Sequence, residues 1–116
     1  MLVEDQVDLL ATTRAMLEEH GYRVLEACGA EQALQGAQMF AEPIDLLLTD
    51  LVMPGLNGGQ LAEKFLVQRP GIRILYMTGY SEDIDVDGSG SFAPVLQKPF
   101  SRSELARAVR AILDHE

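Results

Sequence analysis

A short apolar run at residues 44–49 constrains the fold of this chain more than any other feature. It reads Ile-Asp-Leu-Leu-Leu-Thr and lies between Pro43 and a turn sequence that includes Pro54. A run of this length with such boundaries predicts a β-strand that is buried on both faces, as in parallel sheets. Asp50 follows at once, so its carboxylate is expected at the carboxyl end of the strand, where open α/β sheets bind ligands.

Strand and helix patterns alternate along the rest of the sequence. Strands are predicted at residues 2–3, 22–27, 44–49, 72–77 and 95–97. Helices are predicted from Leu9 until Gly21, over 30–40, over 60–68, and after a capping box at 101–104. Five alternations predict an α/β fold, a doubly wound five-stranded parallel sheet with helices on both faces. The segment 81–94 has three Asp and two Gly, so at most a short or frayed helix is expected there.

Size and composition exclude several classes of function. With 116 residues, 47% of them hydrophobic, the chain suits one compact domain, 1–116. A net charge of −9, with only nine Lys and Arg, argues against direct nucleic-acid binding. No apolar stretch approaches the roughly 20 residues of a membrane span, so no direct membrane contact is expected, although a longer parent protein could be anchored. The single cysteine, Cys28, favours a cytoplasmic location, and it is expected to be a small, buried structural residue.

Three acidic residues follow strands that the topology places side by side. They are Glu4, Asp5 and Asp50. Keeping carboxylates this close all ionised costs free energy unless a cation lies near them. Mg²⁺ prefers oxygen ligands and leaves room for a phosphate. The sequence therefore predicts a Mg²⁺ site. In the alternative interpretation, Glu4 and Asp5 only cap the helix that follows them, which remains possible for one of the two.

Asp50 is also a candidate nucleophile toward phosphorus. A carboxylate forms an acyl phosphate when nearby donors absorb the charge of the transferring oxygens. Thr78 and Lys98, each at the end of a predicted strand, supply a hydroxyl and an ammonium group at the same edge of the sheet. Either residue alone would usually be a turn or surface residue, and their joint position is what suggests a phosphoryl-binding role.

The combined motif resembles the CheY-like response-regulator receiver family. It consists of Glu4-Asp5, Asp50-Leu51-Val52-Met53-Pro54 with Gly58, Thr78-Gly79 and Lys98-Pro99-Phe100. The resemblance runs from Leu2 to about Leu113. It implies a flavodoxin-like (βα)₅ fold with strand order 2-1-3-4-5. It also implies a signalling switch that catalyses only its own phosphorylation and slow dephosphorylation, with a histidine kinase or phosphotransfer domain as phosphodonor.

The resemblance also implies individual roles. Asp50 would be the phosphoacceptor, with Glu4 and Asp5 serving Mg²⁺ and Val52 contributing its backbone carbonyl. Thr78 would be the switch hydroxyl and Lys98 the ion-pair partner of the phosphate, with a cis peptide bond between Lys98 and Pro99.

Several positions depart from the family pattern. Val95 stands where the family usually has Phe or Tyr, so a switch based on an aromatic rotamer is not expected. Val52 and Tyr80 would flank the acyl phosphate and slow its hydrolysis by obstructing water. The short first strand, as though upstream residues had been removed, and the sequence around 78–82 and 97–100 resemble receivers at the C-terminal end of hybrid histidine kinases. A stand-alone protein, and a monomer or weak dimer, also fit the sequence.

Two alternative functions belong to other classes. A phosphohydrolase of the haloacid dehalogenase type would use Asp50 as nucleophile, but it needs a second acid two residues later, where this chain has Val52. A phosphate-independent interaction module on the same scaffold is disfavoured because all five site positions carry competent residues.

Overall fold

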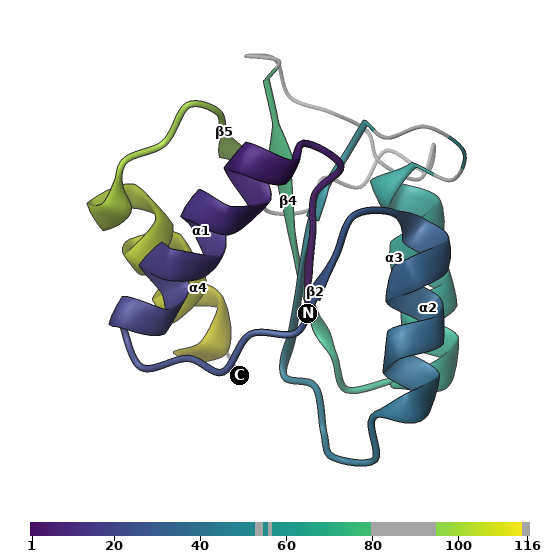
Figure 1. Ribbon diagram of the computed structural model, residues 1–116. Helices are drawn as coiled ribbons and strands as arrows, with labels where there is room; N and C mark the ends of the chain where they lie inside the picture. Colours follow the sequence, from purple (N-terminus) through teal and green to yellow (C-terminus); the bar gives the residue numbers. More distant parts are fainter. Residues whose placement is uncertain (53–54, 56, 80–94, 115–116) are drawn as a thin grey trace.

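The computed structural model describes residues 1–52, 55, 57–79 and 95–114 (Figure 1). Within these ranges it contains strands and helices in the predicted alternation. In chain order they are β1 (Leu2–Val3), α1 (Val7–Glu19), β2 (Glu26–Ala27), α2 (Ala30–Met39), β3 (Leu46–Asp50), α3 (Gly58–Gln68), β4 (Arg73–Thr78), β5 (Val95–Gln97) and α4 (Arg102–Asp114). The strands form one five-stranded sheet in the order β2-β1-β3-β4-β5. Every pair is parallel, so the predicted flavodoxin-like topology is confirmed.

The helices cover both faces of the sheet and create two apolar cores. Helices α1 and α4 lie on one face, and α2 and α3 lie on the other (Figure 1). In β3, Leu47 belongs to the core under α2 and α3, whereas Leu48 belongs to the core under α1 and α4. Neighbouring side chains of a strand point to opposite faces. The prediction that this strand is buried on both faces is therefore confirmed.

Local signals explain where α1 ends and where α4 begins. Helix α1 ends in a Schellman motif, in which the N–H groups of Gly21 and Tyr22 donate to the carbonyls of Glu18 and Leu17 at 3.0 and 3.2 Å. Gly21 has φ +90°, which explains the glycine at this position. The capping box predicted before α4 is present, since the backbone N–H of Ser101 donates to the Glu104 carboxylate at 2.9 Å and the reciprocal bond measures 3.0 Å.

Some predicted boundaries are wrong. Strand β2 contains only two residues rather than 22–27, because its sheet partner β1 is itself two residues long. Helix α3 begins at Gly58 rather than residue 60, because Asn57 and Gln60 form a reciprocal capping box that starts the helix earlier. The helix expected within 81–94 falls outside the described residues.

The prediction for Cys28 is also wrong, because its side chain is exposed. Cys28 directly follows β2, a strand at the edge of the sheet, and leads into α2. Its backbone N–H and its thiol both donate to Gln32 Oε1, at 2.7 and 3.0 Å. The residue therefore belongs to the connection before α2 rather than to the core.

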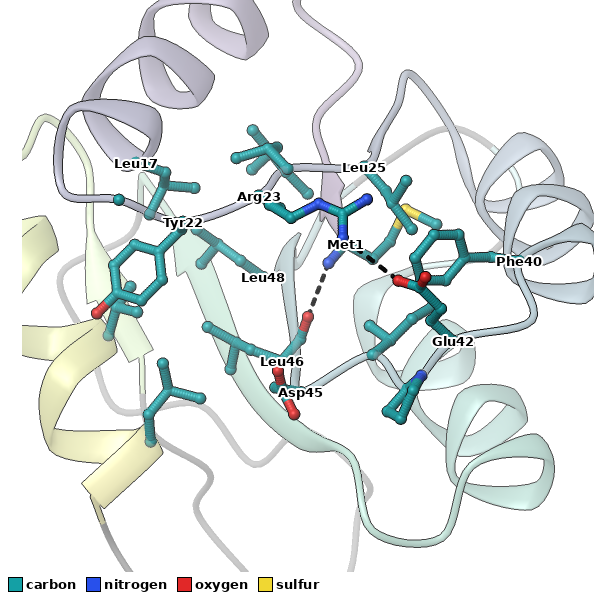
Figure 2. Close-up of a pocket in the computed structure, with 17 residues that line it drawn as sticks. Met1, Leu17, Tyr22, Arg23, Leu25, Phe40, Glu42, Asp45, Leu46 and Leu48 are labelled. Atoms are coloured by element: carbon teal, nitrogen blue, oxygen red, sulfur yellow. Dashed lines mark hydrogen bonds and ion pairs between the residues drawn. The ribbon is translucent and has the colours of Figure 1, made fainter.

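A cavity of about 620 Å³ opens at the amino-terminal end of the strands (Figure 2). Its walls are largely apolar and include Leu17, Leu25 and Phe40. Arg23 and Glu42, also among the lining residues, form an ion pair of 3.3 Å. None of the lining residues is a predicted site residue. No helix in the described ranges has the length and apolar composition needed to cross a membrane.

Arg69 binds the carboxyl-terminal end of α2. Its guanidinium donates to the carbonyls of Ala37 at 3.0 Å, Phe40 at 2.6 Å and Glu42 at 2.9 Å. The last carbonyls of a helix lack partners within the helix, and α2 has no basic residue in its last turn. Arg69, the residue directly after α3, therefore supplies the cation and the donors that the end of α2 lacks.

Replacing Arg69 should destabilise the domain. We expect Arg69→Met to lower the free energy of unfolding by about 2 kcal/mol, because the carbonyls lose charge-assisted hydrogen bonds. Urea unfolding followed by circular dichroism measures the change. Arg107→Met is the matched control, since Arg107 is exposed. Its one hydrogen bond in the described part of the chain goes to the carbonyl of Ser103 in its own helix, at 3.4 Å. Equal losses in the two variants would contradict this role for Arg69.

A substitution at Thr13 in α1 should stabilise the domain, in contrast to the loss expected at Arg69. Its side chain is fully buried, and its hydroxyl is the one buried side-chain oxygen without a hydrogen-bond partner in the described part of the chain. An unsatisfied buried hydroxyl costs free energy, so Thr13→Val should raise the free energy of unfolding by about 1 kcal/mol. Thr12→Val is the control, because the exposed Thr12 hydroxyl already donates to the Asp8 carbonyl at 2.9 Å. A loss of stability in Thr13→Val, measured by urea unfolding, would contradict this expectation.

Candidate functional site

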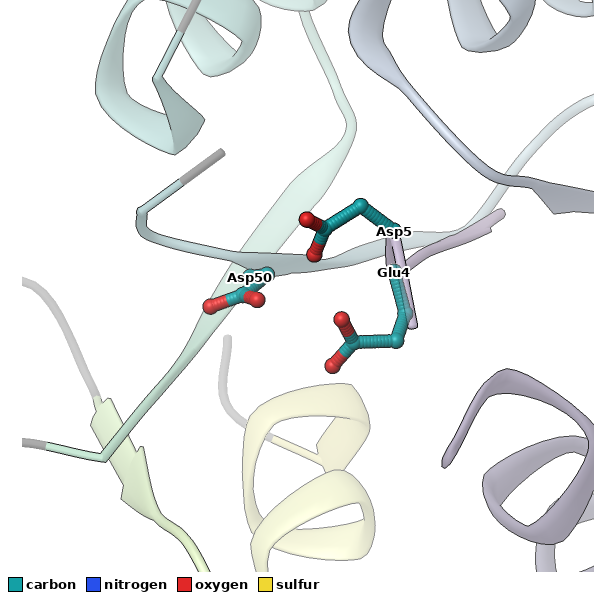
Figure 3. A group of neighbouring side chains, drawn as sticks. All are labelled: Glu4, Asp5 and Asp50. Carbon is teal, nitrogen blue, oxygen red and sulfur yellow. The ribbon is translucent and has the colours of Figure 1, made fainter. Parts of the chain in front are cut away.

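Three carboxylates meet at the carboxyl-terminal edge of the sheet (Figure 3). Glu4 and Asp5 follow β1, and Asp50 is the last residue of the neighbouring strand β3. Each residue offers an oxygen atom, and these oxygens all lie within 4.8 Å of one another. Glu4 is fully buried, Asp50 is 7% exposed, and Asp5 is exposed to solvent. We call this group, together with Lys98, the acidic cluster.

Lys98 reaches the acidic cluster from the end of β5. Its ammonium group donates to Glu4 Oε1 at 2.6 Å and to Asp50 Oδ2 at 3.0 Å. Its backbone N–H donates to the carbonyl of Thr78 at 2.7 Å, which continues the pairing of β4 and β5 beyond Gln97. The Lys98–Pro99 peptide bond is cis, as the resemblance implies.

The charges of the acidic cluster do not balance. Three carboxylates and one ammonium leave a net charge of −2 when all are ionised. Desolvation raises the pKa of Asp5 above its usual value of 3.8, and hydrogen bonding with Glu4 and the negative charge of Glu4 raise it further. Burial lowers the pKa of Lys98, but hydrogen bonds to Glu4 and Asp50 and their charges outweigh burial and raise it overall. The arrangement therefore retains negative charge that a cation can compensate.

The remaining predicted site residues are placed as follows. Thr78 is the last residue of β4 and is 1% exposed, next to the β5 end that carries Lys98. Val52 lies two residues after Asp50, and its side chain is 55% exposed. Val95 pairs with Tyr76 at the start of β5 and is 38% exposed. Pro99 is exposed, whereas Tyr80 lies outside the described residues.

Sequence reasoning missed the direct contact between Glu4 and Lys98. The sequence predicts that Glu4 is a metal ligand or a helix cap, and its Oε2 does accept the backbone N–H of Gln6 at 3.1 Å. The alternation of side chains along the strand indicates only the face on which Glu4 lies, not its contact with Lys98. Leu2 points into the α1 and α4 core and Val3 into the opposite core, so Glu4 is directed to the same side as Leu2.

Comparison with known proteins agrees with this geometry. The family model of the response regulator receiver domain matches residues 1–110. The chain belongs to this family and is a receiver domain, a signalling switch of two-component systems.

Its relatives differ in overall length. Over 116 residues the chain is 33% identical to the response regulator receiver protein CpdR of Brucella abortus (strain 2308), covering 97% of this chain and 94% of CpdR. Over 121 residues it is 30% identical to the sensor kinase CckA of the same organism, covering all of this chain but only 12% of the kinase. The chain thus matches nearly the whole of one relative and a small part of the other.

A solved structure of a receiver domain has the same fold as this chain. The signal receiver domain of an HD domain-containing protein from Pseudomonas fluorescens Pf-5 superimposes with a TM-score of 0.83 at 26% identity. The superposition covers 98% of this chain and 92% of that domain.

Proposed function

We propose that Asp50 is the phosphoacceptor of this receiver domain, which residues 1–116 form as a single unit. The observation that carries the proposal is the acidic cluster, in which the Asp50 carboxylate lies at the end of the central strand beside an ammonium and two further acids. A carboxylate oxygen of Asp50 attacks the phosphorus of a phosphohistidine on a histidine kinase or phosphotransfer partner. A P–O bond forms while the P–N bond breaks, and the departing imidazole keeps the electron pair and takes up a proton. Water later cleaves the acyl phosphate to restore Asp50 and release phosphate.

The cluster fits a magnesium ion. Its donors are carboxylate oxygens from three residues, and their net charge of −2 with Lys98 matches a hard divalent cation. Asp5, Asp50 and the carbonyl of Val52 would hold the ion, with Glu4 contributing from its contact with Lys98. When bound, Mg²⁺ would neutralise charge on the oxygens of the transferring phosphoryl group.

Lys98 and Thr78 complete the proposed switch. The Lys98 ammonium already touches Asp50, so it is available to pair with a phosphoryl group attached there. Thr78 would donate its hydroxyl to the same group from the end of β4. Because phosphorylation adds charge at an acidic site, it favours a different arrangement of these side chains, and the resulting population shift is the output.

Two arrangements of the domain are supported by its relatives. The match to 12% of the sensor kinase CckA supports a receiver within a longer kinase, and the resemblance of residues 78–82 and 97–100 to receivers of hybrid histidine kinases favours its C-terminal end. The match to nearly all of CpdR supports a stand-alone receiver. In both arrangements the domain acts as a monomer or weak dimer, makes no direct contact with nucleic acid, and catalyses only its own phosphorylation and slow dephosphorylation.

Incubation with acetyl phosphate, with and without Mg²⁺, tests the proposed function. Intact-protein mass spectrometry should find one phosphoryl group per chain, formed only when Mg²⁺ is present. Continuous release of phosphate over many turnovers, without accumulation of the labelled chain, would instead indicate a phosphohydrolase. A chain that neither gains a phosphoryl group nor releases phosphate would be an interaction module.

A further inference from the structure

The first turn of α3 rests directly on the main chain that carries Asp50. A Cβ atom added to Gly58 would lie 2.5 Å from the Asp50 carbonyl oxygen, 2.9 Å from the Leu51 Cα and 3.2 Å from the Asp50 carbonyl carbon. These distances are shorter than the roughly 3.5–4.0 Å at which nonbonded carbon atoms attract each other. All three atoms belong to the backbone, so no flexible side chain can turn aside to make room.

Space, rather than backbone conformation, requires glycine at this position. Gly58 is the first residue of α3, and it does not have a positive φ. Alanine is favoured over glycine in helices. An alanine at position 58 would therefore stabilise the first turn of α3 if its Cβ did not clash with the backbone of Asp50.

Neither side of the contact is free to move. The Leu51 N–H donates to the carbonyl of Met77 in β4 at 2.8 Å, and the buried Thr49 hydroxyl donates to the Asp50 carbonyl at 3.0 Å. On the helix side, the Gly58 N–H donates to the Leu51 carbonyl at 2.9 Å. Further along α3, buried apolar side chains hold the helix to the sheet; they are Leu61, Ala62 and Phe65.

We propose that Gly58 is a positioning residue for Asp50. By leaving room for the Asp50 and Leu51 backbone, it lets α3 and β3 close together and fixes the Asp50 carboxylate relative to Asp5 and Lys98. This inference rests on the proposed function, in which Asp50 accepts the phosphoryl group. Reacting groups must be held in a precise geometry, so moving the Asp50 carboxylate by about 1 Å is enough to slow phosphoryl transfer about a hundredfold.

Gly58→Ala, compared with Gly36→Ala, tests this role. Gly36 lies within α2, and a Cβ there would meet only the end of the Met1 side chain, at 3.6 Å. We expect Gly58→Ala to slow Mg²⁺-dependent labelling by acetyl phosphate between about tenfold and a hundredfold, and Gly36→Ala to label at the wild-type rate. The Mg²⁺ dissociation constant, measured by calorimetry, should rise for Gly58→Ala only. A general loss of stability would not change this constant in a protein that is still folded.

Two further measurements make the result decisive. Both glycine variants are repeated with Thr13→Val as a stabilising background, and folding is checked by circular dichroism at the assay temperature. The backbone amide resonances of Asp50 and Leu51 should shift in Gly58→Ala and stay in place in Gly36→Ala. Wild-type labelling and Mg²⁺ affinity in Gly58→Ala, or its failure to fold even in the stabilised background, would overturn the inference. If the wild type itself takes no phosphoryl group, the proposed function fails, while the amide shifts and Mg²⁺ affinity still test the placement of Asp50.

Discussion

Asp50→Asn should abolish phosphoryl labelling of the domain. The amide has nearly the same shape as the carboxylate but is too weak a nucleophile to form the acyl phosphate. Intact-protein mass spectrometry after incubation with acetyl phosphate and Mg²⁺ should therefore detect only unmodified chains. The fold should persist, because the substitution also removes one of three neighbouring negative charges.

Asp45→Asn is the matched control for this experiment. It also changes a carboxylate to an amide, but at an exposed residue that directly precedes the start of β3 and lies outside the acidic cluster. We expect this variant to label as the wild type does. Wild-type labelling of Asp50→Asn would place the phosphoryl group on another residue and refute the assignment.

Lys98→Met should produce the largest loss of stability. The Glu4 carboxylate is fully buried and receives its 2.6 Å hydrogen bond from Lys98, so the variant leaves a buried carboxylate without its cation. Removing one partner of such a pair costs about 3–5 kcal/mol. Urea unfolding without Mg²⁺ measures this loss. Lys64→Met is the control, since Lys64 is exposed on α3 and its replacement should change the free energy of unfolding by less than about 0.5 kcal/mol.

A double substitution separates the contribution of the Glu4–Lys98 ion pair from the contribution of Lys98 packing. In a Glu4→Gln background the fully buried carboxylate is already absent and only the contact with Asp50 remains, so Lys98→Met should cost less than it does in the wild type. An unchanged cost would mean that Lys98 stabilises the fold through contacts other than Glu4. Because Mg²⁺ also compensates negative charge, its addition should stabilise Lys98→Met more than the wild type.

The effect of Lys98→Met should also depend on pH. The folded-state pKa of Lys98 is raised above 10.5, so the charged form is favoured by folding. Its contribution is therefore complete below pH 10.5 and is lost as the pH rises through the folded-state pKa. The difference in unfolding free energy between wild type and Lys98→Met should narrow above that pH. A constant difference would contradict stabilisation by the Lys98 charge.

The local parts of this structure could be predicted from the sequence. The apolar run before Asp50 predicted a strand buried on both faces, and Leu47 and Leu48 indeed enter different cores. Gly21 and the Ser101 capping box marked helix ends because their signals involve only neighbouring residues. The motif also predicted which edge of the sheet would hold the acids, since parallel strands bring their carboxyl ends together.

Features that depend on distant contacts were missed or misjudged. Glu4 and Lys98 are 94 positions apart, and their hydrogen bond depends on how β1 and β5 are placed around β3. The length of β2 depends on its partner strand, and the exposure of Cys28 depends on the edge position of β2. The close approach of Gly58 to Asp50 depends on how α3 lies against the sheet. None of these arrangements has a signature within a few residues of sequence.

The double-sided burial of β3 limits how a signal can leave Asp50. This strand is hydrogen-bonded to β1 and β4 and is packed against both cores, so sliding it would break two ladders and open two apolar interiors at once. Such a displacement costs far more than turning a side chain. If Asp50 accepts the phosphoryl group as proposed, we therefore expect the change to pass along the rim of the sheet, from one strand end to the next, while the interior of the sheet keeps its structure.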